Sequence, residues 1–320
     1  MPPSITSYSS ISAFHAKLAQ SKRILAVCGA GLSAASGLPT FRGAGGLWRN
    51  HDAMTLATPE AFEADPGLVW MFYAYRRHMA LKAKPNPAHY ALAELARRRP
   101  GFMCLSQNVD NLHVRASHPS SQLKLLHGSL FAIKCTECSW TDPNNTLDPF
   151  CPSLAPASDD SPSPALLDPK NPLAHVPREE LPRCPECKTG LQRPGVVWFG
   201  EALDEQMLRD IDEWIAREQV DMVLVVGTSG TVWPAAGFAE QARSGGGKGG
   251  KKQGGTTTSV VTVNMELDGG RGYLSKNDFG FEGDAGELLP KLLEPVIGRM
   301  VQGGENGEGE VRWEGGDCSA

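Results

Sequence analysis

The stretch "KRILAVCGAGLSAASGLPTFRG", residues 22–43, decides the fold. Its apolar run at residues 23–28 ends at a glycine and has the length of a buried strand. A glycine-rich turn and a helical pattern follow it. Gly29, Gly31 and Ala34 match the loose pattern G-x-G-x-x-G/A, in which glycines let backbone N–H groups approach a pyrophosphate. Taken alone, the motif also fits a tight strand-to-helix turn that binds nothing.

The sequence after this turn counts against an ordinary hydride-transfer enzyme. A dehydrogenase continues with a second strand that ends in an acidic residue about 20 positions further on. Here residues 37–49 read "GLPTFRGAGGLWR", a segment rich in glycine, proline and aromatic residues that is typical of a loop. We therefore expect a loop to cover a bound nucleotide.

Three later apolar runs resemble the first strand. They are "GFMCLSQNVD", which ends at Gln107, "VDMVLVVGTS", which ends at Gly227, and "SVVTVNME", which ends near Asn264. Helical patterns lie between them, at residues 87–98 and 205–218. Strands that alternate with helices predict an α/β fold, a Rossmann-like parallel sheet with helices on both faces.

Polar residues gather where these strands end, at residues 29–33, 107–110, 227–229 and 264–266. The carboxyl ends of parallel strands share one edge of the sheet, and ligands of such sheets bind there. The four segments therefore predict one site on one rim. His127, in "LLHGSL", follows the second of them. A lone histidine is more often a hydrogen-bonded structural group than a catalytic base. The polar loops that end the neighbouring strands make a catalytic role for His127 more plausible.

The overall composition excludes several classes of partner. The chain has 320 residues and a formal net charge of -5, so it has no general basic field for nucleic acid or anionic membrane. No apolar run approaches the ~20 residues that cross a bilayer. We expect no direct nucleic-acid partner and no membrane partner.

The amino terminus is serine-rich and has no acidic residue before Asp52, as in a transit peptide. Only Lys17, Lys22 and Arg23 are basic before the first strand, and residues 10–22 read as a helix that covers this strand. A cleaved presequence is therefore disfavoured. We expect a cytoplasmic or nuclear location, with the mitochondrion as the alternative.

Four of the eight cysteines form two C-x-x-C pairs. Such pairs aim sulfurs at one point, and four thiolates suit a tetrahedral Zn²⁺ that is structural because no position stays open. Residues 139–183 separate the pairs, a longer gap than a zinc ribbon usually has. Two unrelated pairs, or redox pairs, are the alternative, and Cys151 is expected to be a bystander. The predicted zinc ligands are Cys135, Cys138, Cys184 and Cys187.

The chain divides by composition into a catalytic part and an insert. Residues 134–194 carry the cysteines, are rich in proline, serine and aspartate, and have too little apolar content to fold without the metal. We predict a flexible N-terminus at 1–11, a Rossmann-like nucleotide-binding domain at 12–133 and 195–300, a small zinc-binding insert at 134–194, a flexible Gly/Lys loop at 244–255 and a disordered tail at 301–320.

Taken together, the motifs resemble the sirtuins, NAD-dependent protein-lysine deacylases. "GAGLSAASGLPTFRG", "QNVDNLH", "LHGSL", both C-x-x-C pairs, "PGVVWFGE", "GTS" and "NME" occur in the family's order, over about residues 12–295. The resemblance implies a Rossmann-like domain with a small zinc domain, and NAD and acyl-lysine bound between them. It implies a reaction that couples deacylation to NAD cleavage and yields nicotinamide and O-acyl-ADP-ribose, with acyl-lysine proteins or peptides as partners. We expect a monomer.

The resemblance also implies residue roles. His127 matches the general base that activates a ribose hydroxyl, Asn108 the residue that positions ribose and water, and Asp110 the one that holds the nicotinamide carboxamide. An imidazole suits the task because its ordinary pKa of ~6.5 lies near working pH. The implied NAD contacts are Gly29, Ala30, Gly31, Ser33, Ala34, Phe41, Arg42, Trp48, Gln107, Asn108, Val109, Asp110, Gly227, Thr228, Ser229, Asn264, Met265, Glu266 and Ala285. The loop that pairs with the substrate peptide as an added strand is Val197, Trp198, Phe199, Gly200 and Glu201.

One pair points to a substrate class. Tyr73 and Arg76 lie three residues apart in a helical stretch and so share one face. They match the Y-x-x-R pair that binds the carboxylate of succinyl-, malonyl- and glutaryl-lysine in the class III branch, and Ala53 matches its small pocket alanine. A phenol and a guanidinium suit a carboxylate. Without the family, Tyr73 would be read as core and Arg76 as solvated. Their neighbours Tyr75 and Arg77 are expected to pack or to face water.

The main prediction is therefore a desuccinylase, demalonylase and deglutarylase. The alternatives are a plain deacetylase in which Tyr73 and Arg76 are incidental, a mono-ADP-ribosyltransferase with the same NAD site, and a zinc-ribbon binding module whose nucleotide site is vestigial.

Overall fold

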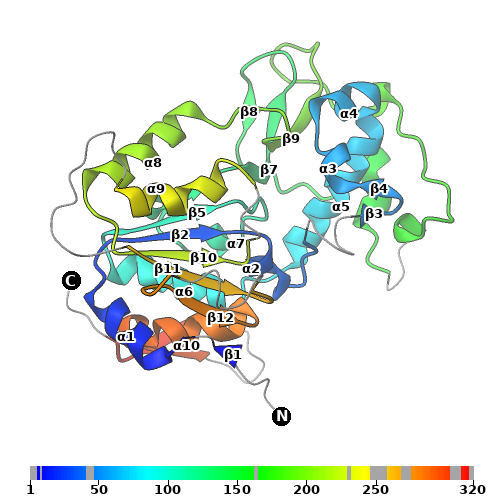
Figure 1. The fold of residues 1–320 in the computed structure, drawn as a ribbon. Coiled ribbons are helices and arrows are strands. Elements are labelled where there is room, and N and C mark those ends of the chain that lie inside the picture. Colours follow the sequence, from blue (N-terminus) through cyan, green and yellow to red (C-terminus); the bar gives the residue numbers. More distant parts are fainter. Residues whose placement is uncertain are drawn as a thin grey trace.

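A seven-stranded sheet forms the centre of the computed structural model (Figure 1). The structure describes residues 6–7, 9–40, 47–161, 165–228, 232–245, 258–267, 275–302 and 311–316. The strand order is β1-β12-β11-β10-β2-β5-β6, and all neighbours are parallel except β1, which pairs antiparallel with β12. The strands are β1 (Thr6–Ser7), β2 (Ile24–Cys28), β5 (Phe102–Ser106), β6 (Leu123–Leu125), β10 (Met222–Val226), β11 (Ser259–Asn264) and β12 (Phe279–Glu282).

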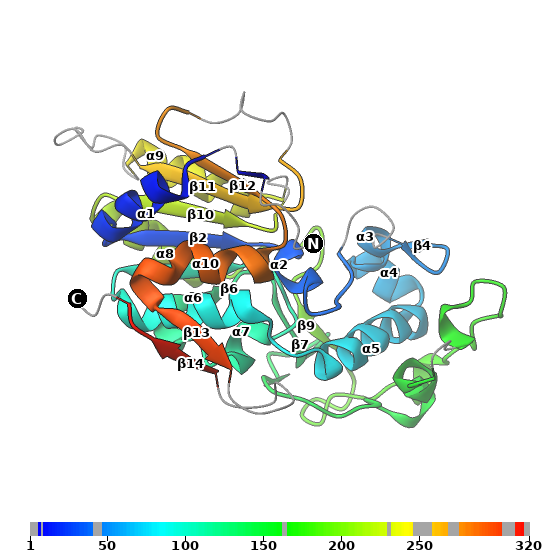
Figure 2. The same cartoon turned by 90° about the horizontal axis from the view of Figure 1, so that it is seen from below.

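Helices cover both faces of this sheet, which confirms the predicted fold class (Figures 1 and 2). One face packs against α1 (Ile11–Gln20), α6 (Pro87–Arg98) and α10 (Ala285–Ile297). The other packs against α8 (Glu205–Arg217) and α9 (Phe238–Ser244). Phe14 and Leu18 of α1 are fully buried, so the expected N-terminal helix is part of the core. Among the described residues, no helix is long and apolar enough to cross a membrane.

The chain winds outward from the middle of the sheet in two directions. Strands β2, β5 and β6 follow one another to one edge, and β10, β11 and β12 follow one another toward the other. This is the doubly wound order, whose reversal point lies between β2 and β10. The segments after β2 and β10 lead to helices on opposite faces of the sheet, and ligands of such sheets bind at this point of the rim.

The sequence predicted the long elements better than the short ones. Helix α6 has the predicted bounds, because Asn86 caps it by accepting a hydrogen bond from the Ala88 N–H and Pro87 begins it. Strands β6 and β12 were missed, since three or four residues give little periodicity. Strand β1 falls in the N-terminus that was expected to be flexible.

A second, smaller module lies beside the main sheet (Figure 1). Its three-stranded sheet has the order β8-β7-β9, with β7 at Gly128–Cys135, β8 at Thr141–Asp142 and β9 at Gln192–Val196. Helices α3 (Ala53–Leu56), α4 (Pro59–Ala64) and α5 (Pro66–Lys82) share one apolar core with it. The prediction gave these helices to the large domain. We propose that residues 53–82 belong to the small domain instead, because their apolar side chains are buried there.

Arg77 connects α5 to this module through buried hydrogen bonds. Its side chain is 1% exposed and donates hydrogen bonds to the carbonyl oxygens of Leu130, Asn145 and Leu147. Its guanidinium lies 5.4 Å from the ring centroid of Phe150. Arg77 was expected to pack or to face water, and it packs: a buried guanidinium needs several acceptors, and these carbonyl oxygens supply them.

The four predicted zinc ligands converge. Their sulfurs all lie within 4.8 Å of one another, with Cys135 Sγ 3.6 Å from Cys187 Sγ and Cys138 Sγ 3.7 Å from Cys184 Sγ. A tetrahedral zinc with 2.3 Å bonds places its sulfurs about 3.8 Å apart. The donor set therefore fits one structural Zn²⁺. Cys151 packs in the module's apolar core, outside this cluster.

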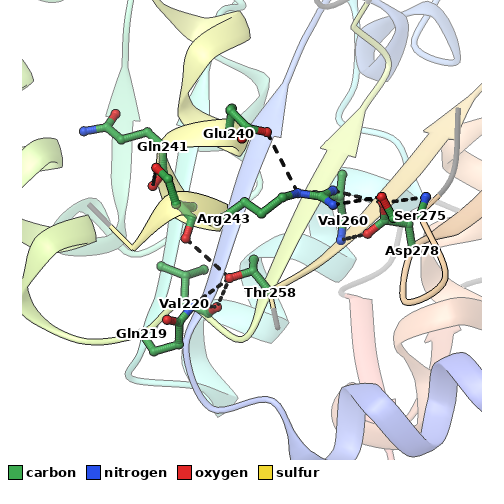
Figure 3. A network of polar contacts seen from close by, with 11 residues as sticks. Gln219, Val220, Glu240, Gln241, Arg243, Thr258, Val260, Ser275 and Asp278 are labelled. Carbon is green, nitrogen blue, oxygen red and sulfur yellow. Dashed lines mark hydrogen bonds and ion pairs between the residues drawn. The ribbon is translucent and has the colours of Figure 1, made fainter. Parts of the chain in front are cut away.

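Polar contacts fix both ends of the Gly/Lys segment (Figure 3). Arg243, at the end of α9, pairs with Asp278 at 2.9 Å and donates to the Ser275 hydroxyl. Thr258 donates to the Val220 carbonyl at 2.8 Å. The predicted flexible loop lies outside the described residues from residue 246 onward.

The tail after Val301 was expected to be disordered, and this is wrong for part of it. Strand β13 (Arg299–Gln302) pairs antiparallel with β14 (Val311–Glu314), and Trp313 packs against the main core. The glycine- and glutamate-rich composition of the tail gave no indication that Trp313 would pack against the core. Residues 303–310 and 317–320 lie outside the described part of the chain.

Arg77→Leu should destabilise the protein by about 3–5 kcal/mol, because several buried carbonyl oxygens lose their donor. Urea unfolding measures this change in the free energy of unfolding. Tyr75→Phe, on the same helix, is the matched control and should change it by less than about 0.5 kcal/mol. Equal effects of the two substitutions would show that the buried hydrogen bonds of Arg77 do not stabilise the fold.

Replacing Cys184 and Cys187 by serine should lower the zinc content by one ion per chain and lower the melting temperature, because the module's fold depends on the metal. Elemental analysis and thermal unfolding measure both. Cys151→Ser, a buried cysteine outside the cluster, should keep the ion. Unchanged zinc in the double variant would contradict the assignment.

Candidate active site

Three glycines bring the loops after β2 and β10 into backbone contact. The Gly29 N–H donates to the Val226 carbonyl at 2.9 Å, and the Gly31 N–H donates to the Gly227 carbonyl at 2.8 Å. A Cβ on Gly31 would lie 2.7 Å from the Gly227 Cα, which no side chain tolerates. Gly227 itself has φ +58°. The two loops therefore meet backbone to backbone at the reversal point, which is where ligands of such sheets bind.

A buried hydrogen-bond network joins this rim to the loop after β5. The Asn108 amide donates to the Gly29 carbonyl at 3.0 Å and to the Ser33 hydroxyl at 3.1 Å. The Ser33 hydroxyl donates in turn to the Asp110 carboxylate at 2.6 Å, and the Leu112 N–H donates to the same group at 2.9 Å. Burial raises the pKa of Asp110, and these hydrogen bonds oppose that rise.

His127 lies next to the network, between β6 and β7. Its Nδ1 is 3.0 Å from the Gln107 carbonyl oxygen, which can only accept, so Nδ1 carries the proton and Nε2 has a free lone pair. Burial lowers the pKa of His127, so the ring is neutral at pH 7. Gln107 donates from its side chain to the Thr228 hydroxyl at 3.1 Å. His127 is thus tied to both sides of the rim.

Tyr73 and Arg76 share one face of α5 and lie near Asp110. The Arg76 guanidinium lies 5.9 Å from the ring centroid of Tyr73 and 5.5 Å from that of Phe72. Burial lowers the pKa of Arg76, while Tyr73 and Asp110 oppose the shift. Tyr73 is 2% exposed, and burial raises its pKa to about 12, so its phenol stays protonated and can donate.

The apolar wall around this pair includes two more predicted residues. Ala53 begins α3 and is buried in the same apolar cluster as Tyr73. Trp48, in β3 (Leu47–Trp48), which pairs with β4 (His51–Asp52), packs edge-on against Phe72 with ring centroids 5.6 Å apart. Ala53, predicted for the acyl pocket, and Trp48, predicted as an NAD contact, therefore belong to the same apolar cluster as Tyr73.

The predicted peptide-binding loop follows β9. The Val197 N–H donates to the His127 carbonyl and the Phe199 N–H to the Ala57 carbonyl, both at 2.9 Å, while the Phe199 side chain is 39% exposed. Glu201 makes a two-point ion pair with Arg193, at 2.5 and 2.9 Å. The Trp198 N–H donates to the Glu201 carboxylate at 2.8 Å and the Glu201 N–H to the Trp198 carbonyl at 3.0 Å. Four of the loop's N–H groups are thus engaged within the chain, Glu201 holds the loop's shape, and Gly200 has φ +92°.

The remaining predicted contacts lie mostly along the same rim. Asn264 ends β11 and accepts from the Gly283 N–H at 2.8 Å, the exposed Met265 and Glu266 follow it, and Ala285 begins α10. Val109 accepts from the Leu130 N–H through its carbonyl, and Ala30 and Ala34 lie in and around α2 (Gly31–Ala34). Phe41, Arg42 and Ser229 lie outside the described residues.

Two residues that support the site were missed. Asn86 donates to the Leu32 carbonyl at 2.8 Å and to the Ser36 hydroxyl at 3.1 Å, which holds the first loop against α6. Its position before Pro87 marked it as a helix cap. Arg193 stacks over Trp198, 3.3 Å from the ring centroid, and no local pattern announced that contact.

Comparisons with known proteins agree with this geometry. The Sir2 family profile matches residues 29–234. A protein of Candida albicans named NAD-dependent protein deacylase is 40% identical, over 89% of this chain and 97% of its own length. The dog protein named NAD-dependent protein deacylase sirtuin-5, mitochondrial, is 41% identical, over 90% of this chain and 86% of its own.

The fold comparison points the same way. The crystal structure of a Sir2 homologue in complex with NAD aligns with a TM-score of 0.68 and 33% identity, over 88% of this chain and 92% of that chain. The family match, the relatives and the shared fold cover the rim, the His127 loop and the cysteine module together. This chain belongs to the Sir2 family.

Proposed function

We propose that the chain is an NAD-dependent protein-lysine deacylase that removes succinyl, malonyl and glutaryl groups. The observation that carries this proposal is the placement of His127, the Asn108–Ser33–Asp110 network and the Tyr73–Arg76 pair around the bare glycine rim. The relatives named as deacylases, sirtuin-5 among them, support it.

The residues of the rim fit the co-substrate NAD. Bound NAD supplies the electrophilic ribose carbon at which nicotinamide is replaced. The glycine turn of the first loop would lie against the pyrophosphate, because it stands at the reversal point of the sheet, where such sheets bind their ligands. Asp110 and Asn108 would orient the nicotinamide and its ribose, since the surrounding hydrogen bonds fix both side chains. The residues after β11 would hold the adenosine ribose.

His127 would act as the general base. The Gln107 carbonyl holds its Nδ1 proton, so the Nε2 lone pair is left to take a proton from a ribose hydroxyl. Its lowered pKa keeps that lone pair available at neutral pH. The Asn108 network lies on the loop after β5, and the Gln107 carbonyl of that loop holds His127, so the base and the ribose position would be kept together.

The acyl preference follows from the α5 face. A neutral, buried phenol and a guanidinium in one apolar pocket offer two donors to a carboxylate. An acidic acyl group offsets the desolvation of Arg76, whereas an acetyl group brings no charge and leaves part of the pocket empty. The small side chain of Ala53 leaves room for the longer acyl chain.

The expected monomeric state stays a prediction. So does the cytoplasmic or nuclear location, with the mitochondrion as its alternative, since the dog relative is named a mitochondrial protein. Acyl-lysine proteins are the proposed partners.

Arg76→Met should lower kcat/KM for a succinyl-lysine peptide by roughly 10- to 150-fold, because a charge-assisted hydrogen bond of about 1.5–3 kcal/mol is lost. The weak activity on the matched acetyl peptide should remain. Steady-state assays on the two peptides, with and without NAD, measure both. Tyr75→Phe, one residue away but outside the shared face, is the control. An equal loss on both peptides would leave deacylation standing and refute the acyl preference.

The pH profile of kcat/KM should fall on the acidic side with a midpoint below 6.5, because protonation removes the Nε2 lone pair and burial lowers the pKa of His127. His127→Gln should abolish turnover while NAD still binds, as measured by calorimetry. A variant that keeps turnover, or a limb centred above 6.5, would exclude His127 as the base.

A further inference from the structure

A second group of metal-ligating side chains lies beneath the rim, on the side of the sheet covered by α6. Cys28 ends β2, Cys104 lies on the neighbouring strand β5, and His113 belongs to α7 (Leu112–Arg115). Their ligand atoms all lie within 4.8 Å of one another. Cys28 Sγ and Cys104 Sγ are 3.9 Å apart. All three residues are at most 1% exposed, and none belongs to the four-cysteine cluster.

The imidazole of His113 has no hydrogen-bond partner in the described structure at either ring nitrogen. The neighbouring His89 ring, 5.1 Å away between centroids, likewise leaves its Nε2 unpartnered. An unsatisfied buried polar group costs about 1–3 kcal/mol. A folded domain normally satisfies such groups, so this one points to a ligand between the imidazole and the two sulfurs.

We propose that Cys28, Cys104 and His113 form a second metal site, for a thiophilic cation such as Zn²⁺ or Cu⁺. Two thiolates and an imidazole are the soft donors that these ions prefer over oxygen ligands. With metal–sulfur bonds of 2.3 Å, tetrahedral or trigonal geometry places two sulfurs about 3.8–4.0 Å apart, so the observed pair needs no rearrangement. Binding releases the two thiol protons and involves no oxidation.

The charge balance of the complex favours Zn²⁺ over Cu⁺. Two thiolates and a neutral imidazole cancel the charge of Zn²⁺, so the complex is neutral in the apolar interior. With Cu⁺ the complex would keep one negative charge, which disfavours burial. In favour of Cu⁺, this ion is stable with three ligands, the number that the site provides. The shared chemistry is thiolate ligation, and the metal supplied during expression distinguishes the two ions.

The position of this site links it to the rim. The Cys28 carbonyl accepts from the Gln107 N–H at 2.9 Å, and Gly29 follows Cys28 directly. The Leu112 N–H, beside His113, donates to Asp110. A bound ion would therefore join β2, β5 and α7 behind the two loops of the candidate active site and stiffen both.

The test uses the full-length protein expressed in zinc-, cobalt- or copper-supplemented medium, so that metal can enter during folding. Elemental analysis should find two zinc ions per chain in the wild type and one in Cys28→Ala and in Cys104→Ala. Cys151→Ala, a buried cysteine outside both clusters, should retain two. In the cobalt-loaded protein, the sulfur-to-cobalt absorbance should fall by about one third in Cys104→Ala, because two of six metal-bound thiolates leave the coordination sphere.

The remaining cobalt absorbance of the four-cysteine cluster reports that each variant is folded. One zinc plus one copper ion in the copper-grown wild type, with the copper absent from Cys104→Ala, assigns the site to Cu⁺. One ion per chain in both wild type and Cys104→Ala, in every medium, would overturn the proposal and leave the group as ordinary core. This test is independent of deacylation.

Discussion

The backbone contact between Gly31 and Gly227 is the constraint on which the site depends. It closes the gap between β2 and β10 where the sheet reverses its winding, and it allows no side chain on either residue. Because the two loops meet as bare backbone, the Gly29 carbonyl is free to accept from Asn108, and Thr228 stands where Gln107 can reach it. The Gly29 carbonyl and Thr228 thus fix the positions of Asn108 and Gln107, to which the other polar groups of the site are hydrogen-bonded.

Burial gives the groups around this contact their protonation states. The loss of water lowers the pKa of His127 and raises those of Tyr73 and Asp110, and in each case desolvation is the largest cause. A neutral imidazole accepts a proton, a protonated phenol donates a hydrogen bond, and Arg76 is left as a cation that gains from an acidic ligand. One physical cause thus sets the protonation states of the proposed base and of the proposed carboxylate-binding pair.

Much of this architecture could be predicted from the sequence, where the signal was local. Asn86 and Pro87 fixed the start of α6, and glycine after an apolar run fixed the turn after β2. The non-local features could not be predicted this way. The burial of Arg77 depends on carbonyls more than fifty residues away, and Trp313 anchors a hairpin inside a tail whose composition resembles disorder. The small-domain placement that we propose for the helices at 53–82 could not be predicted either, because periodicity shows that a helix has an apolar face without showing what covers it.

Two adjacent arginines of helix α5, Arg76 and Arg77, have different surroundings. Arg77 points into the cysteine-bearing module and is held by its carbonyl groups, while Arg76 lies on the face that carries Tyr73. A helix turns about 100° per residue, so fixing one guanidinium also fixes the direction of the next. The module that the zinc organises therefore sets the orientation of the proposed carboxylate clamp. The proposed acyl preference of α5 would thus depend on the metal cluster that organises the neighbouring module.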